Sequence, residues 1–239
     1  MLIEILTSDI DVKQKIFYAL IMIFALTLSF SVHEFMHAFT ADWLGDPTPR
    51  NMGRLTLNPM AHMDPMGTVL LLVAGFGWGK PVVYNPNKLK RFKSYRWMNI
   101  MVHLAGVTGN FVVALICGII NAFLITLGNV ENPVILTLTL TFSYTMAFSL
   151  ALLAFNLLPI PPLDGFHVVE ELFPLKLKYS EGYRKFQRFA PMIIWIVFLM
   201  GSFGRIPGLG IAIQVIEFPF AWVINAISGG ISSLLSNFL

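Results

Sequence analysis

The chain has 239 residues, of which 56% are hydrophobic and only 12% are charged, and its mean hydropathy is +0.72. Because soluble domains carry roughly 25% charged residues, this composition excludes an ordinary soluble protein and predicts an integral membrane protein. The net charge of +3 is too small to indicate a nucleic-acid partner. At about 20 apolar residues per crossing, we expect an all-α polytopic bundle of about five to six transmembrane helices.

The first predicted helix is apolar, runs from about residue 16 to residue 44 and ends at Gly45-Asp46-Pro47. The next apolar run, residues 66–78, is too short for a full crossing and contains three glycines, so we expect a re-entrant or interfacial segment. A small β element is expected at PVVYN, residues 81–85. The later helices are expected at about 97–127, 133–158, 166–173 and 186–203, with a final apolar segment from about 208 that crosses the membrane or lies at its interface.

Together these elements predict a single membrane-embedded domain over residues 1–239, with a core over about 16–173 and C-terminal helices over about 186–239. Basic residues gather in the loops 80–96 and 174–190, which are therefore expected on the cytoplasmic side. If the short apolar run does not cross, the C-terminal half of the first helix lies toward the cytoplasm. If that run does cross, the same half lies toward the outside.

The stretch SVHEFMHAF places His33, Glu34 and His37 inside the first apolar helix. Side chains four residues apart share one helix face, so both imidazoles can bind a single metal ion, and Glu34 can lie beside that ion. This spacing is typical of zinc hydrolases, in which a carboxylate takes a proton from the attacking water. The residue frequencies would give the pattern about 0.003 times by chance, so the spacing itself carries information. The alternative is a histidine pair that hydrogen-bonds neighbouring helices with Glu34 as its partner.

A catalytic zinc ion usually has three protein ligands, so a third ligand is expected elsewhere. Asp42 lies five residues after His37 and points to a different helix face. Asp164 is the better candidate, because it follows a long apolar helix and the proline-rich segment 159–162, where irregular backbone must line protein or a cavity. The alternative is that Asp164 only caps a short helix that begins at Gly165.

Two specific motifs and two supporting stretches resemble a known family. The motifs are HEFMH at residues 33–37 and NLLPIPPLDG at residues 156–165. The supporting stretches are LAGVTGN at residues 104–110 and RLTLNPMAHMDPMGT followed by GWGKPVVYNP. Over roughly residues 20–170, the chain is similar to the site-2 protease family of intramembrane zinc metalloproteases, especially its compact bacterial and archaeal members. Val107 stands where proline is usual in that family, and Met36 stands where a small residue is frequent.

The resemblance implies that one Zn²⁺ per chain is held by His33, His37 and Asp164, and that Glu34 is the general base. It also implies an active site toward the cytoplasmic side of the cell membrane. The expected function is zinc-dependent hydrolysis of a peptide bond in or near a transmembrane segment of a single-pass membrane protein, as in regulated intramembrane proteolysis. The expected partners are that substrate, the lipid bilayer and a regulatory membrane protein.

Three further polar residues are weaker candidates for the site. Asn156 and Asn110 could donate hydrogen bonds to a bound substrate, or they could join neighbouring helices; the resemblance favours a substrate role for Asn156. His167 lies three residues after Asp164 and could support the metal ligands, or it could occupy an ordinary helix position. His103 is expected to be structural.

Two other classes of function remain open at this stage. One is a zinc-binding membrane protein without protease activity, such as a metal carrier or a chaperone-like relative, although metal carriage needs no general base. The other is a structural helix-packing protein without a metal. The sequence also leaves only about five residues for the turn between the two central helices, which is too short to hold an inserted peptide-binding domain.

Overall fold

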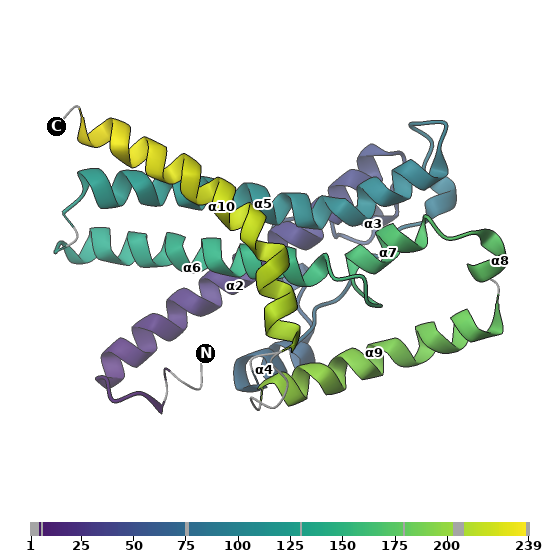
Figure 1. Ribbon diagram of the computed structural model, residues 1–239, viewed down its shortest axis with the longest axis horizontal. Coiled ribbons are helices and arrows are strands. Elements are labelled where there is room, and N and C mark those ends of the chain that lie inside the picture. Colours follow the sequence, from purple (N-terminus) through teal and green to yellow (C-terminus); the bar gives the residue numbers. More distant parts are fainter. Residues whose placement is uncertain are drawn as a thin grey trace.

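The computed structural model describes residues 5, 7–74, 77–129, 131–178, 180–202 and 208–237 (Figure 1). The longer helices are α2 (Val12–Trp43), α4 (Pro65–Ala74), α5 (Tyr95–Leu127), α6 (Pro133–Asn156), α9 (Glu181–Ser202) and α10 (Gly208–Ser236). The shorter ones are α3 (Thr48–Asn51), η1 (Pro59–Ala61), η2 (Pro86–Lys88), α7 (Asp164–Glu170) and α8 (Leu175–Lys178). These bounds confirm the predicted order of the helices.

Within the described ranges, four helices are long and apolar enough to cross a membrane: α2, α5, α6 and the segment Gly210–Ser236 of α10. The chain is therefore an all-α, multi-pass membrane protein, with fewer candidate spans among the described residues than the five to six that we expected. The expected span at 186–203 corresponds to α9, which is not among the candidate spans. The last residue of the expected span, Phe203, lies outside the described residues. The N-terminal part of α9 carries Glu181, Arg184, Lys185 and Arg188, and these charges lower its hydropathy.

Small residues allow the spanning helices to pack closely, as is usual in membranes. On α2, Ala25, Ser29, Ala38 and Ala41 are fully buried. The Ser29 hydroxyl lies 2.8 Å from the hydroxyl of Ser149 on α6, which joins these two helices. In Figure 1, α5 and α6 run side by side, and α10 crosses both of them.

Glycines on α5 take a direct part in this packing. A Cβ atom built at Gly109 would lie 2.5 Å from Cγ of Met36 on α2, and one at Gly118 would lie 2.6 Å from Cγ2 of Ile224 on α10. Gly109, in the stretch LAGVTGN, therefore lies on the face of α5 that packs against α2. The final helix packs into the bundle, since Ile224 is only 1% exposed.

The segment between α2 and α5 differs in part from the expected one. Helix α4 has ten residues, about 15 Å of helix, so it is shorter than a membrane crossing. Gly75 and Phe76, at the end of the run 66–78, lie outside the described residues, and a re-entrant placement stays a prediction. The expected β element is reduced, in the described part of the chain, to one bridge between Met63 and Gly79, so residues 81–85 form no strand.

The loop 80–85 is nevertheless fixed at both ends. The Lys80 backbone N–H donates to the carbonyl of His62 (2.7 Å), and the Asn85 N–H donates to Oδ2 of Asp46 (2.5 Å). Asp46 is fully buried just after α2, and it also accepts hydrogen bonds from the backbone N–H and the hydroxyl of Thr48. The loop is therefore anchored to the end of the helix that carries His33 and His37.

Candidate metal centre

His33 and His37 lie one turn apart on α2, and both are buried in the bundle. Their Nε2 atoms are 3.1 Å apart, and the rings meet edge to face. The spacing of four residues therefore directs both imidazoles to the same point, as the sequence predicts.

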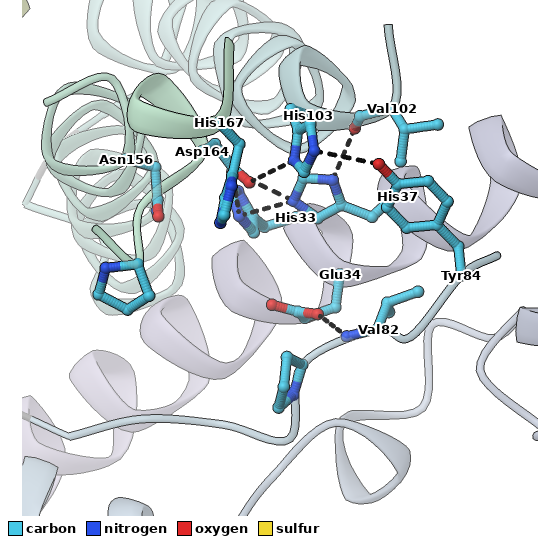
Figure 2. Close-up of a pocket in the computed structure, with 12 residues that line it drawn as sticks. His33, Glu34, His37, Val82, Tyr84, Val102, His103, Asn156, Asp164 and His167 are labelled. Atoms are coloured by element: carbon cyan, nitrogen blue, oxygen red, sulfur yellow. Dashed lines mark hydrogen bonds and ion pairs between the residues drawn. The ribbon is translucent and has the colours of Figure 1, made fainter. Parts of the chain in front are cut away.

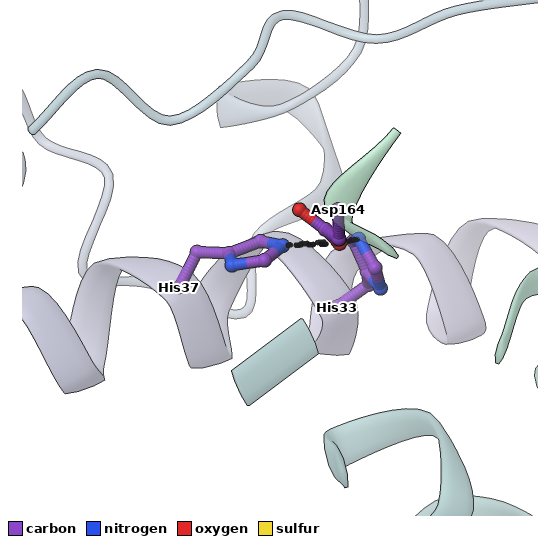
Figure 3. Close-up of side chains that lie close together, drawn as sticks. All are labelled: His33, His37 and Asp164. Atoms are coloured by element: carbon purple, nitrogen blue, oxygen red, sulfur yellow. Dashed lines mark hydrogen bonds and ion pairs between the residues drawn. The ribbon is translucent and has the colours of Figure 1, made fainter. Parts of the chain in front are cut away.

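Asp164 completes this group from the other end of the chain. Its Oδ2 atom lies 3.2 Å from Nε2 of His33 and 3.2 Å from Nε2 of His37 (Figure 3). Helix α7 begins at Asp164 itself, and Leu163 occupies the N-cap position without a side-chain capping bond. The Asp164 carboxylate is thus directed at the histidines and does not cap a helix.

The three atoms have the spacing that a tetrahedral zinc ion requires. Ligand atoms about 2.0–2.1 Å from Zn²⁺ at tetrahedral angles lie about 3.3–3.4 Å from one another. The measured separations are 3.1, 3.2 and 3.2 Å. Oδ2 of Asp164 is also buried without a hydrogen-bond donor, which is costly unless a cation balances it. His33, His37 and Asp164 could therefore hold a metal ion, with the fourth position left for water.

A backbone carbonyl of α5 orients the His37 imidazole. The Nδ1 atom of His37 lies 2.8 Å from the carbonyl oxygen of Val102. A carbonyl only accepts, so Nδ1 carries the proton and Nε2 keeps its lone pair for a metal ion.

Asn110 on α5 plays the corresponding part for His33. Its side-chain nitrogen lies 3.3 Å from Nδ1 of His33, while its Oδ1 atom is buried without a partner. Rotating the amide by 180° pairs Oδ1 with an Nδ1–H group and resolves both features, since the two ends of an amide are assigned from their hydrogen bonds. Asn110 is fully buried and does not line the cavity, so its contact is with His33.

Gly106 lets α5 approach the two histidines. A Cβ atom at this position would lie 2.5 Å from Nε2 of His37 and 2.6 Å from Cε1 of His33. Because these atoms belong to the metal group, any side chain on residue 106 would occupy the space that the imidazoles need. Sequence reasoning missed this residue, although it lies in the LAGVTGN motif.

Glu34 lies beside the metal group without joining it. Its Oε2 atom accepts a hydrogen bond from the backbone N–H of Val82 (3.1 Å), so the loop 80–85 holds the carboxylate in place (Figure 2). Glu34 lines a cavity of about 220 Å³ together with His33, His37 and Asp164. The site thus combines a group that could hold a metal ion, a carboxylate and a cavity with space for a substrate or water.

Asn156 and His167 also line this cavity. The side-chain nitrogen of Asn156 donates to the carbonyl of Leu152 on its own helix (2.9 Å), so its contact in this structure is local. His167 lies 3.0 Å from the carboxylate of Glu170, and its ring stacks on His103 with 4.8 Å between the ring centroids. His167 therefore contacts His103, which in turn faces Asp164 of the metal group.

Two of the polar side chains that line the cavity, Tyr84 and His103, were not predicted as site residues from the sequence. The Tyr84 hydroxyl lies 3.0 Å from Nε2 of His103, and Nδ1 of His103 lies 3.8 Å from Oδ1 of Asp164. Burial, and next the negative charge of Glu171, raises the pKa of Tyr84, so its hydroxyl stays protonated. A usable signal existed, because His103 lies three residues before Gly106 and seven before Asn110, on the same face of α5.

Comparison with known proteins decides the family. The model of peptidase family M50 matches residues 123–201. The Bacillus subtilis protein named "Putative zinc metalloprotease YwhC" is 37% identical over 191 residues, which cover 76% of this chain and 82% of that protein. The chain belongs to peptidase family M50.

Other relatives of this M50 chain carry a similar name. "Putative zinc metalloprotease Rip2" of Mycolicibacterium smegmatis is 33% identical over 60% of this chain and 53% of that protein. The Rip2 protein of Mycobacterium tuberculosis strain H37Rv is 29% identical over 79% of this chain and 71% of that protein. No solved structure matches the chain.

Family membership confirms the expected chemical class. The protein is a membrane-bound zinc metalloendopeptidase, and its metal is Zn²⁺. The structure offers the group of His33, His37 and Asp164 for that metal.

Proposed function

We propose that this zinc endopeptidase hydrolyses a peptide bond in or near a transmembrane segment of a membrane protein. The observation that carries the proposal is the place of the metal group: His33 and His37 lie within α2, a helix that is long and apolar enough to cross the membrane. An active site built into a spanning helix meets substrates that are themselves in the membrane. Such a site also explains why costly polar groups lie in an apolar segment.

In this proposal, His33, His37 and Asp164 would hold the zinc ion, which would supply a Lewis acid for the scissile carbonyl and for the attacking water. Glu34 acts as the general base and takes a proton from the attacking water. The same carboxyl group then passes the proton to the leaving amine. The hydrogen bond from the Val82 N–H engages one carboxylate oxygen of Glu34, so the other oxygen is free to accept the proton.

A substrate helix must unwind before its peptide bond can react, because helical peptide groups are already hydrogen-bonded. The loop 80–85 is suited to hold the unwound segment. Among the described residues, the N–H groups of Val83 and Tyr84 carry no hydrogen bond, and Val83 is 53% exposed. We propose that an extended substrate pairs with these groups by strand addition, and that Asn156 reaches the bound backbone from the opposite wall of the cavity.

We further propose that the active site opens toward the cytoplasm and that residues 1–239 act as one membrane-embedded domain. Two groups of basic side chains support this orientation. One lies in residues 80–96, which include the loop 80–85, and the other lies in residues 174–190, after α7. The packing of α10 against α5 and α6 supports one domain. The expected substrate is a single-pass membrane protein, and a second membrane protein would regulate its access.

Replacing Glu34 by glutamine tests the proposal, because the change removes the base and keeps the size of the side chain. Membranes that contain the wild-type protein, the Glu34→Gln variant and a Glu131→Gln control in the turn before α6 are compared by quantitative proteomics. We expect the Glu34→Gln protein to retain zinc, while a single-pass membrane protein accumulates uncut only in that sample. Equal substrate profiles for wild type and Glu34→Gln would remove Glu34 from the mechanism and count against cleavage of a single-pass membrane protein.

A further inference from the structure

The two carboxylate oxygens of Asp164 have different surroundings. Oδ2 faces both histidines of the metal group at 3.2 Å and receives no hydrogen bond from the part of the chain that the structure describes. Oδ1 faces away from that group, toward Nδ1 of His103 at 3.8 Å. The asymmetry suits a carboxylate that binds a metal ion through one oxygen and is steadied through the other.

His103 is itself held from two sides (Figure 2). Its Nε2 atom lies 3.0 Å from the Tyr84 hydroxyl, and its ring stacks on His167 with an interplanar angle of 21°. The imidazole therefore has little freedom to rotate, and its Nδ1 atom stays directed toward Asp164.

The contacts of this group are consistent in direction. Nδ1 of His103 lies 3.8 Å from Oδ1 of Asp164, which is within ion-pair range but longer than a direct hydrogen bond. An anionic carboxylate only accepts, so it favours the proton on the facing Nδ1 atom and leaves Nε2 as an acceptor. The Tyr84 hydroxyl can supply the missing donor, and its contact with His103 is shorter than its contact of 3.4 Å with Oδ1 of Asn99. Asn99 in turn donates to the carboxylate of Glu171, just after α7 (3.3 Å), so the chain of contacts returns to the helix that begins at Asp164.

We propose that His103 and Tyr84 form a positioning pair that holds Oδ1 of Asp164, so that Asp164 meets the zinc ion through Oδ2 alone. Tyr84 fixes the imidazole and His103 fixes the carboxylate. Tyr84 belongs to the loop that also holds Glu34 through the Val82 N–H. One loop therefore controls the position of the base and, through His103, the position of a metal ligand.

The pair rests on the proposed role of Asp164 as a zinc ligand, and zinc binding tests it without any substrate. Full-length protein is purified in detergent, and its zinc affinity is measured by competition with a chelator. We expect His103→Ala to weaken zinc binding by about 10–100-fold, which is the usual cost of losing a partner of a metal ligand. Tyr84→Phe should weaken it by about 10-fold, because the ring stays and only the hydroxyl is lost.

Two comparisons separate positioning from general packing. His103→Asn keeps a donor near the place of Nδ1 and should recover most of the affinity, whereas His103→Gln places its amide near Nε2 and should not. In the double variant, Tyr84→Phe should cost nothing beyond His103→Ala, since the two residues act through one contact. Tyr95→Phe is the matched control, because Tyr95 is exposed at the start of α5.

Cobalt substitution gives a signature that packing alone would not change. When Oδ1 is released, Asp164 can bind through both oxygens, so visible bands of Co²⁺ should weaken as the coordination number rises in His103→Ala and Tyr84→Phe. An unchanged spectrum together with wild-type zinc affinity in Tyr84→Phe would overturn the pair. If Asp164→Ala loses zinc while His103→Ala keeps it, only the pair is wrong; if Asp164→Ala keeps zinc, the proposed ligand set fails instead.

Discussion

The two walls of the cavity are built in different ways. The metal wall is formed by His33, His37 and Asp164. The Nδ1 atoms of both histidines and the Oδ1 atom of Asp164 face groups on α5. On the loop wall, residues 80–85, hydrogen bonds fix the two ends and hold Glu34. The backbone N–H groups of Val83 and Tyr84 carry no hydrogen bond among the described residues. The comparison teaches that metal binding needs a preorganised wall, whereas an unwound substrate needs one that can still accept hydrogen bonds.

Removing a residue of the metal wall should have the largest effect on zinc binding and on cleavage. We expect His37→Ala to reduce zinc content to background and to abolish cleavage, because two remaining ligands do not hold catalytic zinc. Zinc per chain is measured by elemental analysis of purified protein. His62→Ala is a histidine control away from the cavity lining. Full zinc occupancy in His37→Ala would remove this residue from the metal wall.

Adding one methyl group to the metal wall should come next. Gly106→Ala places a Cβ atom 2.5 Å from Nε2 of His37, so the imidazoles must shift and zinc affinity should fall by at least about 10-fold. Gly109→Ala is the matched control on the same helix, since its Cβ atom meets the flexible side chain of Met36. We expect that control to bind zinc normally. Equal zinc affinities for the two variants would contradict the close approach at Gly106.

Asn110 tests whether the His33 imidazole is oriented from α5. Asn110→Leu removes the acceptor for Nδ1–H and should weaken zinc binding by about 10-fold, whereas Asn110→Asp keeps a carboxylate acceptor and should bind zinc nearly as well as wild type. Chelator competition measures both variants. The interpretation fails if the leucine and aspartate variants lose the same affinity.

The smallest effects are expected on the loop wall. Val82→Pro removes the N–H group that holds Glu34 and should lower kcat by about 3–10-fold with zinc unchanged, the usual cost of one hydrogen bond. Val83→Pro removes an unpaired N–H group and should raise KM instead, because strand addition loses a donor. A fluorogenic peptide assay separates kcat from KM. Zinc loss in either variant would show that the Val82 or Val83 N–H group acts on the metal group, as is proposed for the Tyr84 side chain, and not only on Glu34 or the substrate.

Local patterns predicted a large part of this protein. The apolar runs predicted the order of α2, α5 and α6 and placed their ends within four residues of the observed ones, because the hydropathy of a membrane span is a property of neighbouring residues. The same reasoning identified His33 and His37, since four residues along a helix set their relative direction. The predicted strand at 81–85 was wrong, because strand formation depends on a partner from elsewhere in the chain.

The third member of the metal group shows where local reasoning weakens. Sequence features favoured Asp164 but also allowed a helix cap, and only the fold shows that α7 begins at Asp164 with its carboxylate directed at α2. His103 was expected to be structural for a similar reason. The proposed role of His103 depends on its contacts with Asp164 and Tyr84, which are distant in sequence, and no local pattern encodes those contacts.

The sequence by itself determined a polytopic helical membrane protein with a zinc-hydrolase motif in its first long apolar helix, because hydropathy and helical spacing act over a few neighbouring residues. Only the tertiary structure decided how α5 approaches α2 at Gly106, which groups orient each member of the metal group, and how one loop reaches both Glu34 and His103. Those contacts join residues between 19 and 131 positions apart, and packing of whole helices brings them together.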